Sequence, residues 1–356
     1  MSRPVDVVIA VHSPNRPVGR AVASVLDGNR SAARLTVVCH NLPTDDIAAV
    51  IDPRYHDDVR FLEHRDSHRS ASGPFNAGMR AADGDFVSIM GSDDVLQPGA
   101  VRSWLDVAER TGAETVMCRL RIGSPPRRVR TPPVRPWLRG RADPVRDRLS
   151  YRSAPLGIVS QQARDRLGLE LVEGMVVGGD VAYVTRLWFE TRVAVDRRGP
   201  AYVIGEDARD RVTYTPRPIP LELAFVRDLL AQPWFRGYDG AARRSVCIKL
   251  TRIHLFGAVY NRRNPAMWNA EDRRALAVVA RELLTAAMGF ERVLSLADVA
   301  LLNAILDPES DTGHLIRLSE QRRRHGHPRT LLTRSPADLL RTESPARLMA
   351  ASALLG

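Results

Sequence analysis

The stretch GDFVSIMGSDDVLQPGA, residues 84–100, places two adjacent aspartates directly after an apolar run. The apolar residues 86–90 lie between glycines and predict a buried β-strand. A proline then predicts a helix over about residues 98–110, and turn formation before this helix explains one aspartate. Two carboxylates at the carboxyl end of a buried strand repel each other unless a cation or hydrogen-bond donors lie between them. Because ligands bind at this edge of α/β sheets, Asp93 and Asp94 are candidate ligand or metal residues.

Strand and helix patterns alternate through the first third of the chain. Apolar runs predict further strands over residues 5–11, 34–40, 59–64 and 113–122, and helical spacing predicts a helix over residues 73–83. Such alternation predicts an α/β fold with a doubly wound, mostly parallel sheet, whose loops gather at the strand ends.

The remaining chain has a different character. Residues 124–148 are rich in proline and arginine, so we expect an irregular excursion there. After residue 220 several segments show apolar residues at helical spacing. We therefore predict two domains: an α/β domain over residues 1–220 and a helical region over residues 221–356.

Composition narrows the class of protein. The chain has 356 residues, 44% of them hydrophobic, and a net charge of +11, which favours anionic partners. Its three cysteines are odd in number and lack metal-ligand spacing, so we expect buried thiols in a reducing compartment. No signal peptide or apolar run of membrane-spanning length is visible. We expect a cytoplasmic protein, with peripheral association with the membrane left open.

The order of these signals resembles family 2 glycosyltransferases of the GT-A fold. The resemblance rests on VVIAVHS at residues 7–13, GPFNAGMRAADGDFVSIMGSDD at residues 73–94 and GGDVAYVTRLW at residues 178–188. It implies that residues 1–220 form a GT-A catalytic domain that binds a nucleotide sugar at the strand ends. Residues 221–356 would then serve acceptor binding, oligomerisation or membrane docking. The positions that match the family's nucleotide-binding residues are Ala10, His12, Ser13, His40, Asn41, Gly73, Asn76, Ser92 and Asp93. Gly91 departs from the family, because it stands where the Asp-x-Asp signature has its first aspartate.

The chemistry of sugar transfer assigns roles to the carboxylates. The leaving diphosphate must be neutralised, and Asp93 matches the family's ligand for Mg²⁺ or Mn²⁺. Asp94 is either a second metal ligand or a residue that holds the turn. Asp180 matches the family's general base, and its alternative is an N-cap of the following helix. His40 or Asn41 could accept the imide hydrogen of uracil, which favours a UDP-sugar.

The resemblance thus predicts an inverting hexosyl- or N-acetylhexosaminyltransferase. We expect transfer from a nucleotide-sugar donor to a hydroxyl of a cell-surface polysaccharide or teichoic-acid-like polymer, and self-association is left open. One alternative is a nucleotidyltransferase, although the chain lacks a glycine-rich phosphate loop after its first strand. Another is a degenerate transferase that binds an anionic polymer. No nucleic-acid-binding motif accompanies the basic charge, so we expect no nucleic-acid partner.

Overall fold

The computed structural model describes residues 5–207 and 217–354, which form two compact units. The first, which we call the α/β unit, comprises Met1–Arg130, Leu138–Ala142 and Arg152–Arg211. The second, the helical unit, comprises Thr131–Trp137, Asp143–Tyr151 and Val212–Gly356. The helical unit therefore includes two pieces of the arginine-rich excursion, which the sequence analysis had placed in the first domain. The boundary at residue 220 stays a prediction for truncation experiments.

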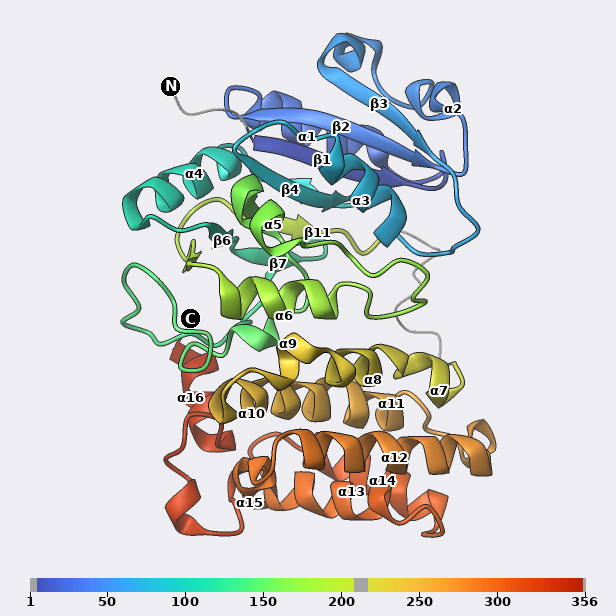
Figure 1. Cartoon of the computed structure of the whole chain (residues 1–356), viewed down its shortest axis with the longest axis vertical. Coiled ribbons are helices and arrows are strands. Elements are labelled where there is room, and N and C mark those ends of the chain that lie inside the picture. Colours follow the sequence, from blue (N-terminus) through green and yellow to red (C-terminus); the bar gives the residue numbers. More distant parts are fainter. Residues whose placement is uncertain (1–4, 208–216, 355–356) are drawn as a thin grey trace. The chain divides into compact units, whose positions relative to one another are not determined.

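The α/β unit is built on a seven-stranded sheet (Figure 1). Its order is β10 (Val193–Val195), β6 (Thr115–Met117), β9 (Gly157–Ser160), β4 (Phe86–Gly91), β1 (Val5–Val11), β2 (Ala33–His40) and β3 (Val59–His64). Strand β9 is antiparallel to both neighbours, and the other pairs are parallel. The predicted doubly wound, mostly parallel sheet is confirmed, and the strand of the opening stretch is the central β4.

Within residues 5–207, six α-helices accompany this sheet. They are α1 (Val18–Asn29), α2 (Thr44–Ala48), α3 (Ser72–Arg80), α4 (Ala100–Thr111), α5 (Gln161–Leu167) and α6 (Val181–Glu190). Helix α3 packs closely on the sheet, since a Cβ at Gly78 would lie 2.2 Å from Val8 Cγ1. Helix α4 begins two residues later than predicted, because Gly99 before it has a left-handed φ of 79°.

The single strand predicted over residues 113–122 is wrong. The chain leaves the main sheet after β6 and forms β7 (Leu120–Ile122) in a second sheet of order β5 (Val95–Leu96), β11 (Tyr202–Ile204), β7, β8 (Arg127–Arg128). At the crossing, the N–H of Cys118 donates to Leu156 O, whereas Arg119 O accepts from the N–H of Tyr202. Adjacent residues thus hydrogen-bond to different neighbours, which explains why one apolar run serves two sheets.

The helical unit contains the predicted C-terminal helices (Figure 1). They are α7 (Ile219–Glu222), α8 (Ala224–Ala231), α9 (Pro233–Arg236), α10 (Gly240–Lys249), α11 (Phe256–Tyr260), α12 (Ala270–Ala286), α13 (Leu296–Leu306), α14 (Thr312–Arg322), α15 (Pro328–Leu331) and α16 (Pro345–Leu354). A π-helical turn, Leu250–Leu255, joins α10 to α11. Within residues 5–207 and 217–354, no helix combines the length and apolarity needed to cross a membrane. All three cysteines are buried and free, as predicted.

Candidate functional site

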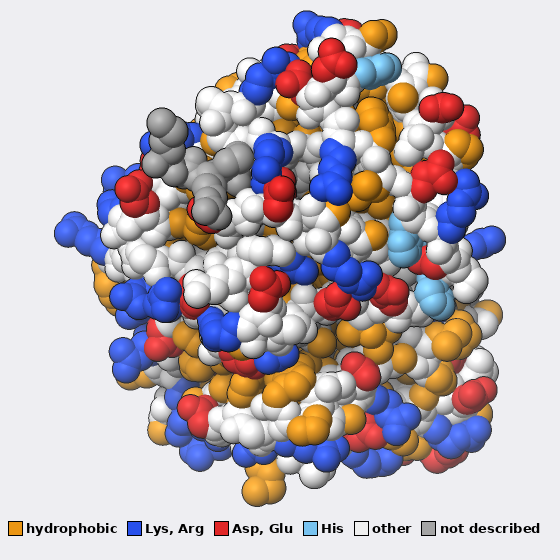
Figure 2. Space-filling model, turned by 45° about the horizontal axis from the view of Figure 1, so that its top comes forward, with side chains coloured by type: hydrophobic (Ala, Val, Ile, Leu, Met, Phe, Trp, Pro, Cys, Tyr) orange, Lys and Arg blue, Asp and Glu red, His pale blue; other side chains and the backbone are white. Residues whose placement is uncertain are grey.

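The parallel register brings the predicted strand-end residues to one edge of the main sheet. Ala10 pairs with Val38 of β2 on one side and with Gly91 of β4 on the other. The residues that follow these three strands therefore emerge at the same edge. This edge receives His12 and Ser13 after β1, His40 at the end of β2 and the aspartate pair after β4. Figure 2 shows acidic, basic and histidine side chains interspersed on the face turned to the viewer.

Asp93 contacts two arginines: Arg16 in the connection between β1 and α1, and Arg20 in the first turn of α1. Its Oδ1 accepts from Arg16 Nη2 at 2.8 Å, and its backbone O accepts from Arg20 Nη2 at 2.7 Å. Arg16 Nε also donates to Ser92 Oγ at 3.1 Å. Arg20 Nη1 also lies 2.6 Å from Asp207 Oδ2, so guanidinium and carboxylate groups alternate at this part of the edge. Neither arginine was predicted from the sequence.

Asp94 lies equally deep but is used differently. Its Oδ2 accepts from the hydroxyl of Tyr202, and its Oδ1 accepts from the N–H of Gly205 at 2.9 Å. Burial raises the pKa of this carboxyl. A Cβ at Gly91 would lie 2.5 Å from Asp94 Oδ2, so the glycine at the family's first aspartate position makes room for Asp94. These contacts agree with the turn-holding alternative, and metal binding by Asp94 stays a prediction.

The residues of this edge fit a divalent cation that is held mainly by the substrate. Mg²⁺ usually takes one or two carboxylates together with substrate phosphates and water. Asp93 offers such a carboxylate, whereas both oxygens of Asp94 already accept hydrogen bonds. Among the described residues, no group of three or more His, Cys, Asp or Glu is arranged to hold a metal ion. A cation here would therefore depend on a bound diphosphate for most of its ligands.

A carboxylate between two histidines lies at the ends of β2 and β3. The pair His40 and His64 are register partners, and their Nε2 atoms each lie 2.9 Å from one oxygen of Asp66. Burial disfavours the charged form, but hydrogen bonds from His40, a backbone N–H and His64 hold the pKa of Asp66 well below its usual range. An ionised carboxylate only accepts, so both Nε2 atoms donate and Nδ1 is the acceptor left on a neutral His40.

Gly73 and Asn41 complete this cluster. A Cβ at Gly73 would lie 2.5 Å from Asp66 Oδ2, so only glycine allows the start of α3 to approach the carboxylate. Asn41 adopts a positive φ of 61°, and its Oδ1 accepts from the N–H of Asp66 at 2.9 Å. Asp66 and His64 were missed from the sequence, although the third strand also ends in polar residues.

Asn76, one of the predicted nucleotide-binding residues, lies in α3. Its side chain is buried, with Nδ2 donating to Leu171 O and Oδ1 accepting from Leu171 N, both at 2.9 Å. Nδ2 also donates to Glu173 Oε1 at 2.9 Å. The amide group therefore anchors the loop between α5 and α6, and its predicted contact with the donor stays untested.

The same loop positions Asp180 at the start of α6. A Cβ at the preceding Gly179 would lie 2.6 Å from Ser72 Oγ, so the loop packs directly against the start of α3. Asp180 is half-buried and occupies the N-cap position, but its side chain makes no capping hydrogen bond to the helix. The capping alternative therefore does not describe what this carboxylate does.

Sequence comparison identifies the unit that carries this site. Residues 6–168 match the profile of Glycosyl transferase family 2. This matched segment is a family 2 glycosyltransferase domain. The chain is 30% identical over 123 residues to the succinoglycan biosynthesis protein ExoO of Rhizobium meliloti, a match that spans 34% of each protein.

Solved structures extend the likeness in fold to the helical unit. The S. aureus TarS fragment 1–349 in complex with UDP-GlcNAc has a TM-score of 0.70, with 13% identity over 90% of this chain and 91% of that one. The same fragment in complex with UDP has a TM-score of 0.65, with 12% identity over 90% and 91% of the two chains. At this identity the likeness shows the GT-A fold and its helical C-terminal region.

Proposed function

We propose that this protein is an inverting glycosyltransferase that moves a sugar from a UDP-sugar to a hydroxyl of a cell-surface polysaccharide. The observation that carries the proposal is the edge of the sheet where Asp93, two arginines and the Asp66 cluster meet. The Asp66 cluster offers polar groups for the nucleobase, and the two arginines offer guanidinium groups for the diphosphate. The protein is not a nucleotidyltransferase on this proposal, because the connection after β1 has no glycine-rich phosphate loop.

The leaving diphosphate is held by Asp93 and its arginines. Arg16 and Arg20 supply guanidinium groups that suit phosphate oxygens. A Mg²⁺ or Mn²⁺ ion bound by Asp93 would add charge that neutralises the diphosphate as it leaves. Arg16, which contacts Asp93 Oδ1, would then turn toward the phosphate oxygens.

The acceptor hydroxyl is activated by Asp180. Asp180 is a half-buried carboxylate at the start of α6, and it accepts the hydroxyl proton as the new glycosidic bond forms. A single displacement of this kind, with the base on the face opposite the leaving group, inverts the anomeric carbon. Anchoring of the loop by Asn76 keeps Asp180 in position during this step.

The relatives support the choice of donor and acceptor. The TarS fragment is described in complex with UDP-GlcNAc and with UDP, which favours a uracil nucleotide. ExoO is described as a protein of succinoglycan biosynthesis, which favours a polysaccharide acceptor. Nδ1 of His40 is the ring acceptor available for the imide hydrogen of uracil.

One experiment tests the proposal. The full chain is incubated with Mn²⁺ and a panel of UDP-, GDP- and dTDP-sugars, and nucleotide release is measured with and without polysaccharide fractions. We expect release of UDP that increases with acceptor. Tight binding of UDP without release from any donor would instead favour the degenerate transferase, and release of another nucleotide would overturn the assignment of uracil.

A further inference from the structure

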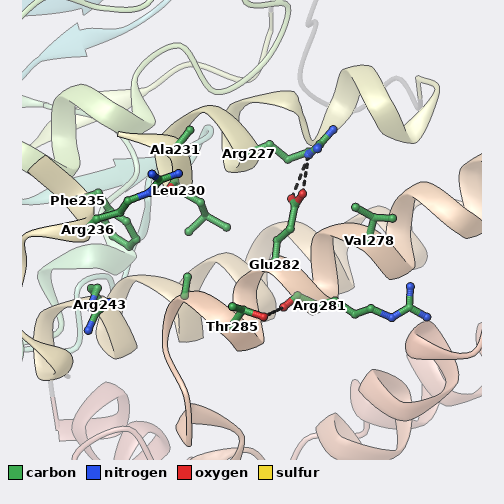
Figure 3. A pocket seen from close by; sticks show the side chains of 11 residues that line it. Arg227, Leu230, Ala231, Phe235, Arg236, Arg243, Val278, Arg281, Glu282 and Thr285 are labelled. Atoms are coloured by element: carbon green, nitrogen blue, oxygen red, sulfur yellow. Dashed lines mark hydrogen bonds and ion pairs between the residues drawn. The ribbon is translucent and has the colours of Figure 1, made fainter. Parts of the chain in front are cut away.

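The helical unit contains a cavity that the transfer reaction does not use (Figure 3). Its volume is about 510 Å³, which is within the range of small-molecule sites. Helices α8, α9, α10 and α12 form its walls. Apolar side chains make up much of the lining: Leu230, Ala231, Phe235, Val278 and Ala286.

Four arginines and one glutamate surround these apolar groups. Glu282 is already neutralised, since both its oxygens accept from Arg227 Nε at 3.0 Å (Figure 3). Arg236 and Arg281 each donate to a backbone carbonyl, which leaves their charge uncompensated by those bonds. The cavity therefore has an apolar lining and a net positive charge at its rim.

Arg243 adds a polar group that lacks a protein acceptor. Its Nε is buried and has no hydrogen-bond partner within the described residues. Burial of such a donor is costly unless a ligand or water accepts its hydrogen. Guanidinium groups match phosphate oxygens in geometry and charge, so an anion of this type suits the position.

We propose that this cavity binds a phosphate-bearing lipid taken from a membrane surface, with the phosphate on the arginines and the chain on the apolar lining. A free phosphate would leave the apolar lining exposed to water, and an uncharged lipid would leave the arginines without an acceptor. Proteins without a membrane-spanning helix use this combination of apolar contact and basic charge to associate with anionic bilayers. The proposal is independent of the transfer reaction.

Binding is tested on the full chain by calorimetry with dodecyl phosphate below its micelle concentration. Inorganic phosphate is the matched probe for the charge of the ligand, and dodecyl maltoside is the matched probe for its alkyl chain. We expect binding of dodecyl phosphate and no measurable binding of the other two. Sedimentation with phosphatidylglycerol vesicles, compared with phosphatidylcholine vesicles, tests the membrane as the source. Equal binding of inorganic phosphate, or no capture by the anionic vesicles, would overturn the proposal.

Three variants locate the binding. Arg243→Gln should weaken dodecyl phosphate binding about fivefold, the usual contribution of one arginine near an anionic surface. Val278→Glu places a carboxylate on the apolar wall at a partly exposed position of α12 and should abolish binding. Arg274→Gln removes an exposed arginine of the same helix outside the cavity and should change nothing. Equal weakening by Arg274→Gln and Arg243→Gln, with unchanged melting temperatures, would show a non-specific charge effect and refute the site.

Discussion

The two units of the chain differ in where their charged side chains lie and in what those side chains contact. In the α/β unit, Asp93, Asp66 and their arginine and histidine partners gather at one edge of the sheet. In the helical unit, Arg252 is buried inside the helix layers, where Nη1 donates to the Tyr151 hydroxyl at 2.9 Å and Nη2 donates to Glu343 O at 2.9 Å. The first set faces a place for a ligand, whereas the second joins distant parts of the chain.

The difference follows from where the strands of a parallel sheet end and where packed helices end. Parallel strands must end at a common edge, so polar residues after several strands are brought together whether or not they contact one another. Helices that pack side by side have no such common edge. Polar groups buried between helices therefore need hydrogen-bond or ion-pair partners inside the protein. Removing one of these groups affects the stability of the fold and not the transfer reaction.

The largest effect is expected from Asp180→Asn. Asparagine keeps the size of aspartate but cannot accept the acceptor's proton. Turnover should therefore fall by roughly 10²–10⁴, the usual contribution of a positioned base, while donor affinity and melting temperature barely change. Asp165→Asn on the exposed face of α5 is the matched control. A loss of turnover smaller than about threefold in a folded variant would reject Asp180 as the base.

Arg252→Met tests whether the buried ion pairs of the helical unit stabilise the fold. Removing the guanidinium leaves the buried carboxylates of Glu343 and Asp298, at 3.4 and 3.8 Å, without this partner. We expect a loss of about 3–5 kcal/mol in the free energy of unfolding, measured by urea titration and circular dichroism. Arg317→Met, which removes an exposed arginine of α14, should leave the unfolding midpoint unchanged. Similar midpoints for the two variants would mean that the buried network adds little stability.

The sequence predicted the α/β unit better than the contacts of its site. Apolar runs and turn residues are local signals, so β1, β4 and the strand-end position of Asp93 could be read from them. Arg16 and Asp66 could not, because their partners are 77 and 26 residues away and only the sheet register brings them close. The buried partners of Arg252 in the helical unit lie 41 to 101 residues away and left no local pattern.

Asp93 and Asp94 allow a ligand-binding role and a structural role to be compared within one turn. Asp93→Asn should weaken the Mn²⁺-dependent affinity for UDP at least tenfold and leave the melting temperature near that of the native chain. Asp94→Asn should instead destabilise the fold by about 1–3 kcal/mol. The amide Nδ2 either removes the acceptor of the buried Tyr202 hydroxyl or opposes the N–H of Gly205. Calorimetry with UDP and urea titration measure the two effects. An exchange of the two phenotypes would reverse the roles of the two carboxylates.

The smallest effect is a pH dependence that arises from one histidine of the helical unit. His254 is half-buried with its ring against Phe225, and its Nε2 accepts from Lys249 Nζ at 2.9 Å. Burial and the charge of Lys249 hold the pKa of His254 well below its usual range. Below a pH of about 6.5 the unfolded chain therefore binds a proton at His254 that the folded chain does not bind. The free energy of unfolding thus decreases as the pH falls through that value.

His254→Gln should remove this dependence. Glutamine keeps an acceptor for Lys249 but does not titrate, so the variant should lose about 1.4 kcal/mol less than the native chain between pH 7.5 and 5.5. The measurement is urea unfolding at both pH values, and His325→Gln, which removes an exposed histidine, should behave as the native chain does. Asp180 and Asp93 lie in the other unit, so the variant should keep its donor affinity at pH 7.5. A native-like loss of stability on acidification in His254→Gln would mean that this histidine is protonated in the folded chain.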